Sequence, residues 1–277
     1  MEVLSPEPER LPPAAAMALP ACSVILAAHP DDETIGAGGL LCTGRGCRVF
    51  HLTSGAPSNP SLWPPGLKVT RDEYAQLRRA EAEAALGYAE IPPDRIHLLG
   101  GEDPSSILDA VSLTLRTAGL LARFHPPVLV THAYEGGHPD HDTAALVAHA
   151  AVALLEREGS PVPKLMEMTA YHARDGAFVA GEFLNENATI SMVRVLSEDE
   201  LDRKQRMFES YRSQMAVLSA FPLESERFRN ALRYRFDQPP HPGKLWYELQ
   251  GWMLGGEWRA WARTALQRLE LGADAWL

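Results

Sequence analysis

The chain has 277 residues, of which 45% are hydrophobic and 22% are charged, and its formal net charge at pH 7 is −10. This composition is ordinary for a globular protein that buries a sizeable core, and the length allows one large α/β domain. An acidic chain offers no basic surface for a phosphate backbone or an anionic membrane. We therefore exclude nucleic acid and anionic membranes as partners.

The N-terminal residues and the cysteines indicate the cellular compartment of the protein. Residues 1–22 are rich in proline and lack a basic n-region, so we expect an extended lead-in, not a signal peptide or a membrane span, and then one domain over residues 23–277. Cys22, Cys42 and Cys47 are odd in number and lack a CxxC spacing. This pattern favours free thiols in a reducing compartment, and we predict a cytoplasmic protein.

Four short segments are predicted as strands and alternate with helix-length segments. They are Val24–Ala28, Arg48–Thr53, Arg95–Leu99 and Val128–Thr131. The first and the fourth are apolar runs of the kind found in strands that are buried on both faces of a parallel sheet. The alternation predicts βαβ units, and therefore an α/β fold: a single domain with a Rossmann-like, doubly wound, mostly parallel sheet and helices on both faces.

Helices are predicted between these strands and after them. Thr70 with Glu73, and Ser197 with Glu200, form capping boxes that open two of the helices. We expect the arginines and glutamates of the first of these two helices on a solvated face. The expected helical ranges are 70–85, 106–124, 143–158 and 197–212, and residues 56–69 form a loop long enough to be functional.

The alternation loosens after residue 158. We expect a fifth strand at Met166–His172, a sixth at Ala188–Val195, and a loop at Arg227–Gly243 that closes over a site. His241 lies in this loop and either reaches a substrate or is an ordinary loop histidine. The tail Leu245–Leu271 is rich in tryptophan and largely helical. It packs on the domain, or it serves a dimer or an aromatic aglycone, so a homo-oligomer stays open.

A histidine and three acids follow the first predicted strand directly, in the order His29, Pro30, Asp31, Asp32 and Glu33. Proline is tolerated at a helix start, and acids there suit the helix dipole. In open α/β sheets, ligands bind at the carboxyl ends of the strands. Two interpretations stay open for this motif alone: the acids only cap a helix beside an ordinary histidine, or they belong to a site.

A second histidine-rich stretch, HAYEGGHPDHD at residues 132–142, follows the fourth predicted strand and precedes a helix. It repeats the arrangement of the first motif. Because neighbouring parallel strands lie close together, the two loops can face one another where the halves of the sheet meet. The combined set of side chains is His29, Asp31, Asp32, His138, Asp140 and His141.

These residue types suit a divalent metal ion. Histidine and carboxylate side chains bind zinc and similar ions, and a catalytic site uses three of them and leaves one position for water. His29 and Asp32 with one histidine of the second stretch supply three ligands. Asp31 and the other histidine then match the base and the donor that metal-assisted hydrolysis needs.

The motifs AHPDDE at residues 28–33 and HPDHD at residues 138–142 resemble those of the PIG-L or LmbE-like family, zinc-dependent de-N-acetylases that act on N-acetylglucosamine-containing conjugates. The resemblance extends more weakly over residues 24–247. It implies that His29, Asp32 and His141 bind zinc, or another divalent ion such as Fe²⁺. Its other implied roles are Asp31 as the general base, His138 as the oxyanion stabiliser or acid, Asp140 as the residue that orients His138, and Arg78 and Asp103 as substrate contacts.

The chain departs from this family at Gly136, where some members have a tyrosine, and Tyr134 or Glu135 is the expected substitute. The leading hypothesis is a zinc-dependent hydrolase whose partner is a small acetamido-sugar conjugate. One alternative is a non-haem iron oxygenase with two histidines and one carboxylate, a triad expected on an all-β jelly roll. Another is a non-catalytic metal- or sugar-binding module. The candidate base and donor beside the ligands favour the hydrolase.

Overall fold

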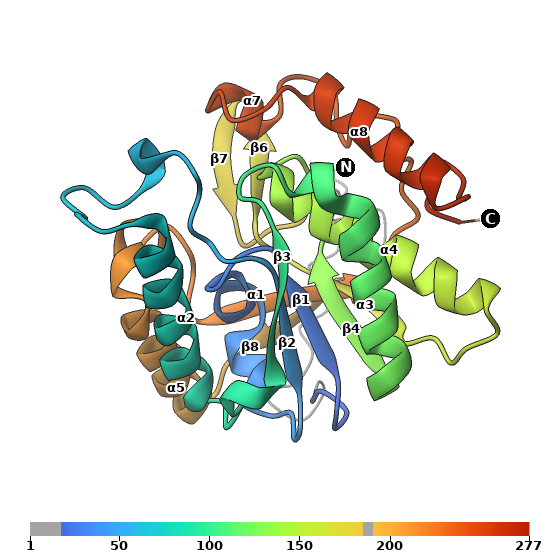
Figure 1. Cartoon of the computed structure of the whole chain (residues 1–277). Helices are drawn as coiled ribbons and strands as arrows, with labels where there is room; N and C mark the ends of the chain where they lie inside the picture. The colour runs from blue at the N-terminus through green and yellow to red at the C-terminus, as the bar shows by residue number, and fades with distance from the viewer. Residues whose placement is uncertain (1–17, 185–190, 277) are drawn as a thin grey trace, which may run out of the picture.

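The computed structural model of the chain describes residues 18–184 and 191–276 (Figure 1). Its strands are β1 (Val24–Ala27), β2 (Arg48–Thr53), β3 (Ile96–Gly101), β4 (Val128–His132), β5 (Lys164–Met168), β6 (Tyr171–Arg174), β7 (Ala177–Ala180), β8 (Met192–Val195) and β9 (Ser225–Asn230). Seven of them form one sheet in the order β3-β2-β1-β4-β5-β9-β8, and β6 and β7 form a separate hairpin. β1 to β5 pair in parallel, whereas β9 and β8 are antiparallel. The predicted mostly parallel, doubly wound sheet is confirmed.

The first strand separates two hydrophobic cores. Ile25 and Ala27 belong to one core, while Val24 and Leu26 belong to the other, and all four side chains are fully buried. Side chains alternate between the faces of a strand, and here both faces are covered. This is why the strand has a continuous apolar sequence instead of an alternating one.

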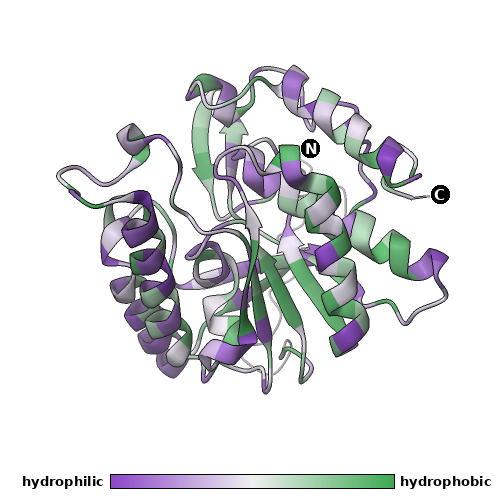
Figure 2. Cartoon of the chain, in the orientation of Figure 1, coloured by the Kyte–Doolittle hydropathy of each residue, from purple (hydrophilic) through white to green (hydrophobic). Residues whose placement is uncertain are grey.

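Helices cover both faces of the sheet. They are α1 (Asp32–Leu41), α2 (Arg71–Gly87), α3 (Ala110–Phe124), α4 (Pro139–Arg157), α5 (Glu198–Ser210), α6 (Met215–Leu218), α7 (Trp246–Leu249) and α8 (Gly255–Arg268). Figure 1 shows α2 and α5 on one side of the sheet and α3, α4 and α8 on the other, and α5 packs on both α1 and α2. Figure 2 shows hydrophobic residues concentrated on the strands and hydrophilic residues on α2. Both predicted capping boxes are present, at Thr70 and at Ser197.

Helix α1 is interrupted near its middle, because Ala37 has the non-helical angles φ −146° and ψ 16°. A fully buried ion pair satisfies the backbone groups that the interruption frees. Lys204 Nζ donates to the carbonyl of Ile35 at 3.0 Å and lies 2.9 Å from Glu226 Oε1. The same oxygen of Glu226 accepts a hydrogen bond from the amide of Gly39 at 2.7 Å. Buried backbone groups need such partners, so the pair fixes the course of α1.

The second half of the chain differs from the prediction at several points. The predicted strand at Met166–His172 is two strands, β5 and β6, which lie in different sheets. The predicted loop at Arg227–Gly243 is wrong over its first residues, which belong to β9. The predicted sixth strand is β8, and its expected first residues, 188–190, lie outside the described residues, as do residues 1–17 of the expected lead-in.

The strand order places β1 and β4 side by side at the centre of the sheet. The chain continues to β2 and β3 on one side of this pair and to β5 on the other. Crevices at such a switch point, outside the carboxyl ends of the strands, are where α/β sheets bind ligands. Both histidine-rich loops begin there. No helix within residues 18–184 and 191–276 has the length and apolar character needed to cross a membrane.

Candidate functional site

The loop after β1 holds Asp31 in an unusual backbone conformation. Its φ is 125°, a region that residues with a side chain rarely adopt. The amide of Asp31 donates to Glu33 Oε2 at 3.1 Å. Glu33 is fully buried and bonds His51 Nε2 at 2.9 Å and the hydroxyl of Tyr211. These partners explain why the third acid of the motif is needed, since Glu33 holds the backbone that presents Asp31 and Asp32.

The loop after β4 leads into α4 through His138, which is the N-cap residue of that helix. His138 Nδ1 accepts a hydrogen bond from the amide of Asp140 at 3.1 Å. Helix α8 fixes the start of α4 from outside, because Trp258 Nε1 donates to the carbonyl of Pro139 at 3.0 Å. His138 and His141 are thus attached to a supported helix end.

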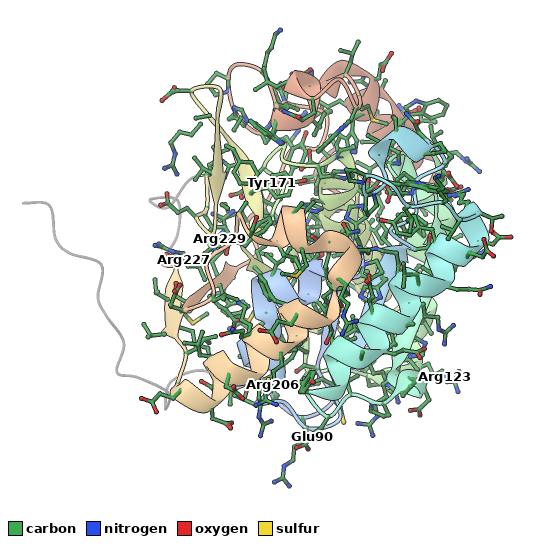
Figure 3. The ribbon with its side chains drawn as sticks, turned by 90° about the vertical axis from the view of Figure 1, so that its left-hand side faces the viewer. Glu90, Arg123, Tyr171, Arg206, Arg227 and Arg229 are labelled. Carbon is green, nitrogen blue, oxygen red and sulfur yellow. The ribbon has the colours of Figure 1, made fainter. Side chains whose placement is uncertain are left out.

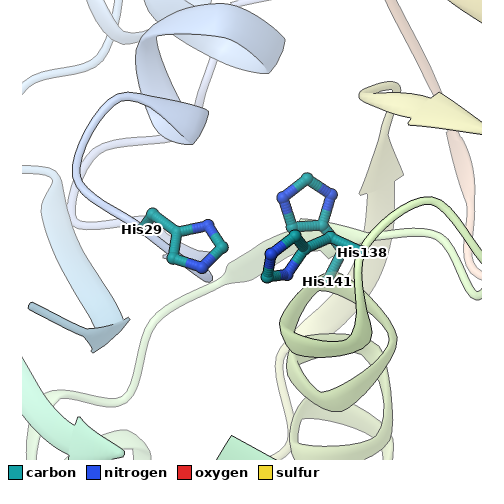
Figure 4. A group of neighbouring side chains, drawn as sticks. All are labelled: His29, His138 and His141. Carbon is teal, nitrogen blue, oxygen red and sulfur yellow. The ribbon is translucent and has the colours of Figure 1, made fainter. Parts of the chain in front are cut away.

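The two loops converge on Asp32. Its Oδ2 lies 3.0 Å from His29 Nδ1, and its Oδ1 lies 3.2 Å from His141 Nε2. Ring nitrogens of His29, His138 and His141 all lie within 4.8 Å of one another. Figure 4 shows His29, from the loop after β1, facing the two histidines at the start of α4. Imidazole nitrogens with a carboxylate oxygen form a donor set that suits a divalent ion.

The structure adds His132 to the group, a residue that the sequence analysis did not select. It is the last residue of β4 and is buried, with Nε2 3.6 Å from Asp32 Oδ2. Its ring stacks on His141 at a centroid distance of 4.1 Å, and its Nε2 accepts a hydrogen bond from the amide of Ala28 at 3.1 Å. The sequence feature that could have identified His132 is its position at the carboxyl end of β4, the strand next to the one that His29 follows.

Asp140 makes different contacts from those we expected. We expected its carboxylate to orient His138, but its amide does so, and Oδ2 is 4.0 Å from His138 Nδ1. Oδ2 lies closer to His29 Nε2, at 3.2 Å. Oδ1 accepts hydrogen bonds from the amide and the hydroxyl of Ser106, at 3.0 and 2.5 Å. The fully buried Asp140 therefore connects α4 and the loop after β3 to His29.

Arg78 and Asp103 both lie at the site. Asp103 Oδ2 is 3.9 Å from His29 Nε2, and burial raises the pKa of Asp103 to about 6. Arg78 Nη2 donates to Asp31 Oδ2 at 3.1 Å and to the carbonyl of Pro30. The expectation of a solvated face is wrong for this part of α2, because Arg78 is only 2% exposed. Among the described residues, Arg78 Nε and Nη1 lack a hydrogen-bond partner.

Burial and neighbouring charges shift the pKa values of two further groups. Burial raises the pKa of Asp31 to about 7; the positive charge of Arg78 opposes this rise, and the negative charge of Asp32 adds to it. Burial, followed by the charges of His29 and His141, lowers the pKa of His138 well below its usual range. The site therefore contains a carboxyl group that can exchange a proton near neutrality and an imidazole that stays neutral.

His29, Asp31 and His141 line a pocket, and neither Tyr134 nor Glu135, the expected substitutes for the family tyrosine, lines it. The hydroxyl of Tyr134 donates to the carbonyl of Gln238 at 2.8 Å, and Glu135 accepts from the amide of Leu184 at 2.7 Å. The pocket instead contains Tyr171, which belongs to β6 and is labelled in Figure 3. Its ring lies 5.1 Å from that of His141. No motif points to Tyr171, because β6 lies outside both histidine-rich stretches.

All of the expected site residues except Asp140 line one pocket. His29, Asp31, Asp32, His138 and His141 contribute to its wall, as do Arg78 and Asp103. Other parts of the wall come from the loop after β2, from α6 and the residues next to it, and from the segment after α7. These further residues are Gly55, Pro57, Leu62, Gln214, Val217, Phe221 and Trp252.

Comparison with known proteins identifies a family and relatives that this chain resembles. The family described as GlcNAc-PI de-N-acetylase, PIG-L, matches residues 24–152, which run from β1 into α4 and contain both loops. A curated relative from Mycobacterium sp. (strain KMS) is named 1D-myo-inositol 2-acetamido-2-deoxy-alpha-D-glucopyranoside deacetylase. It is 29% identical over 229 residues, which cover 70% of this chain and 70% of the relative.

Solved structures share the fold. The antimicrobial reagent A40926 pseudoaglycone deacetylase Dbv21 has a TM-score of 0.56 at 18% identity, covering 77% of this chain and 98% of that one. GalB, the 4-carboxy-2-hydroxymuconate hydratase from Pseudomonas putida KT2440, has a TM-score of 0.52 at 17% identity, covering 73% of this chain and 82% of that one. Because one fold serves a deacetylase and a hydratase, the reaction has to be argued from the site.

Proposed function

We propose that this chain, whose residues 24–152 match the PIG-L family, is a metal-dependent amidohydrolase that removes the N-acetyl group from an N-acetylglucosamine-containing conjugate. The observation that carries the proposal is the meeting of two loops, from β1 and β4, around Asp32 in one pocket. The name of the mycobacterial relative supports the substrate class, because it describes an acetamido sugar joined to a second group.

We propose that His29, Asp32 and His141 hold the metal ion. Both oxygens of Asp32 lie against imidazole nitrogens, and Asp32 and His141 are buried, where a charged group needs a paired partner or a metal ion. Zinc is the proposed ion, with Fe²⁺ as the alternative. When bound, a divalent ion polarises the amide carbonyl of the substrate and lowers the pKa of a water molecule.

Asp31 is the proposed general base. It takes a proton from the attacking water, whose oxygen forms the new bond to the acetyl carbon. The bond between that carbon and the sugar nitrogen then breaks, and Asp31 returns the proton to the leaving amine, so acetate and a free amine result. Arg78 fixes the orientation of the Asp31 carboxylate through Nη2. Arg78 and Asp103 also line the pocket as the proposed substrate contacts.

His138 is the proposed stabiliser of the oxyanion. Its Nδ1 accepts the hydrogen bond from the Asp140 amide, so the single proton of the neutral ring sits on Nε2. That N–H can donate to the oxygen of the acetyl group as negative charge develops there. Of the two roles that the family resemblance implies, this geometry favours the donor over the acid. Asp140 supports the site through its bonds to His29 and Ser106.

The alternatives fit less well. An iron oxygenase triad was expected on a jelly roll, whereas this chain has a parallel α/β sheet. A binding module does not need a strained, arginine-oriented carboxylate beside the metal ligands. A homo-oligomer and a cytoplasmic location remain predictions.

The test is acetate release from a panel of N-acetylglucosaminyl conjugates. Purified protein is assayed as isolated, after chelation, and after addition of zinc or Fe²⁺. We expect acetate from at least one conjugate, loss of turnover on chelation, and recovery with one of the two metals. Full turnover by metal-free protein contradicts the proposed chemistry, and binding of sugar without acetate release supports the binding module.

A further inference from the structure

The pocket has an apolar mouth above its charged floor. Leu62 and Val217 line the pocket and are 43% and 52% exposed, whereas Asp31 and Asp32 are each 5% exposed. Phe221 and Ile35 continue the apolar lining as buried side chains. A single exposed aliphatic residue needs no explanation, but apolar side chains that converge on one pocket beside a reactive centre indicate an apolar ligand.

The two mouth residues come from distant segments that are both held in place. Leu62 ends a short 3₁₀ helix, Pro60–Leu62, in the loop between β2 and α2. The next residue, Trp63, anchors that loop, because its Nε1 donates to the carbonyl of Pro57 at 2.8 Å and its ring lies 5.1 Å from that of Tyr74. The contacts of Trp63 therefore hold Leu62 in position.

Val217 lies on α6, on the segment between α5 and β9. The same segment carries Phe221, whose ring packs against Tyr171 at 5.9 Å and Phe178 at 6.2 Å. These aromatic contacts join the segment to the β6–β7 hairpin. Both walls of the mouth are therefore formed before any substrate arrives, and a preformed apolar surface binds an apolar group with little further ordering cost.

We infer that the conjugate which this enzyme hydrolyses carries an apolar aglycone, an alkyl or aryl group, that lies between Leu62 and Val217 while the acetamido group reaches the floor. This inference rests on the proposed function and refines its substrate. The relative's name includes myo-inositol, a ring that bears hydroxyl groups all round. Such a polyol would leave its hydroxyl groups against aliphatic side chains, and polar groups without partners are costly to bury.

The test compares glycosides of N-acetylglucosamine that have the same anomeric configuration and differ only in the aglycone: methyl, myo-inositol, hexyl and phenyl. Acetate release is measured with metal-loaded enzyme. We expect kcat/KM for the hexyl or phenyl glycoside to exceed that for the methyl and inositol glycosides about tenfold or more, mainly through KM. The relative rates of the hexyl and phenyl compounds distinguish an alkyl from an aryl aglycone.

Two substitutions localise the effect. In the double variant Leu62→Ser/Val217→Ser, the ratio of kcat/KM between the hexyl and methyl glycosides should fall toward one. The control is Leu254→Ser, because Leu254 is 59% exposed and does not line the pocket; its ratio should equal that of the wild type. Equal or better hydrolysis of the inositol glycoside, or an unchanged ratio in the double variant, overturns the apolar aglycone and leaves the deacetylase intact. Absence of acetate from all four glycosides overturns the proposed function itself.

Discussion

Two clusters of buried charge lie along helix α1, one around its interruption and one at its start, and they differ in how completely their charges are paired. Around the interruption of α1, Lys204 and Glu226 bond each other and the freed backbone groups. At the start of α1, four carboxylates gather around His29 and His141, and one of them, Asp31, pairs with Arg78; the carboxylates are Asp31, Asp32, Asp103 and Asp140. The first cluster is complete without any other molecule. The second carries excess negative charge that a cation would neutralise.

Completeness of pairing separates structural charge from functional charge in this fold. Buried charges that hold a fold are paired and hydrogen-bonded. At the second cluster, in contrast, Nδ1 of His132 and Nδ1 of His141 find no hydrogen-bond partner in the part of the chain that the structure describes. Incomplete pairing beside a pocket is a mark of a site. The variants below test the contrast in order of decreasing effect.

The largest effect on stability is expected from Lys204→Met. It leaves the fully buried Glu226 with Arg194 Nη1, 3.9 Å away, as the basic neighbour that the described residues still provide. Removal of one partner of a buried ion pair typically costs about 3–5 kcal/mol. Urea unfolding should show this loss, and the double variant Lys204→Met/Glu226→Gln should recover part of it. A variant that loses turnover at an unchanged unfolding midpoint would place Lys204 in the functional cluster.

His138→Ala should have the opposite profile. It removes the proposed oxyanion donor and with it about 3 kcal/mol of transition-state stabilisation. We therefore expect kcat to fall roughly a hundredfold, while the bound metal remains. The matched control is His241→Ala, since the ring of His241 bonds the carbonyl of its own neighbour, Pro242, at 2.7 Å and does not line the pocket. Equal rates for the two variants would refute the role of His138.

His149, on α4, provides a pH-dependent stability effect away from the site. Burial lowers its pKa from 6.5 to about 4 in the folded chain. The unfolded chain therefore takes up a proton first as pH falls below about 6.5, so this residue destabilises the fold progressively down to about pH 4. The full effect is about 3 kcal/mol. The difference in unfolding free energy between wild type and His149→Leu should grow over that interval; a constant difference would show that His149 does not titrate as expected.

The smallest effect is expected on the surface. Arg206, on the helix α5 that faces the viewer in Figure 3, pairs with Asp202 at 3.0 Å, and both side chains are more than half exposed. Exposed pairs contribute little because solvent screens them. Arg206→Ala should therefore have the unfolding midpoint and the turnover of the wild type. A clear loss of either would show that exposure is a poor guide to the importance of a charge here.

Sequence patterns were sufficient for the first half of the fold and for most of the site. β1 and β4 have largely apolar sequences because both of their faces are buried, and each motif follows one of these two strands. β9 was missed for the converse reason. Its sequence, SERFRN, is polar, yet Glu226 and Arg229 are buried through ion pairs with Lys204 and Glu167. Apolar periodicity cannot detect a strand whose buried residues are charged.

The site predicted from the sequence was incomplete where residues from distant parts of the chain line the pocket. The helix pattern alone favours a solvated face for Arg78, because charged helix residues usually are solvated, and only the family resemblance assigns it to the substrate. In the structure α2 turns Arg78 toward Asp31. Tyr171 and Trp252 reach the pocket from β6 and from the segment after α7, and neither position carries a motif. Only the fold could bring these side chains to the two loops.

Two adjacent carboxylates, Asp31 and Asp32, are assigned different tasks, and metal content measured together with acetate release distinguishes these tasks. Asp31→Asn should retain about one metal ion per chain while kcat falls by roughly a hundredfold or more. Asp32→Asn should lose the metal, because it removes the anionic ligand between His29 and His141. Loss of the metal from Asp31→Asn would show that Asp31 is a metal ligand, and turnover by that variant at the wild-type rate would show that Asp31 is not the base.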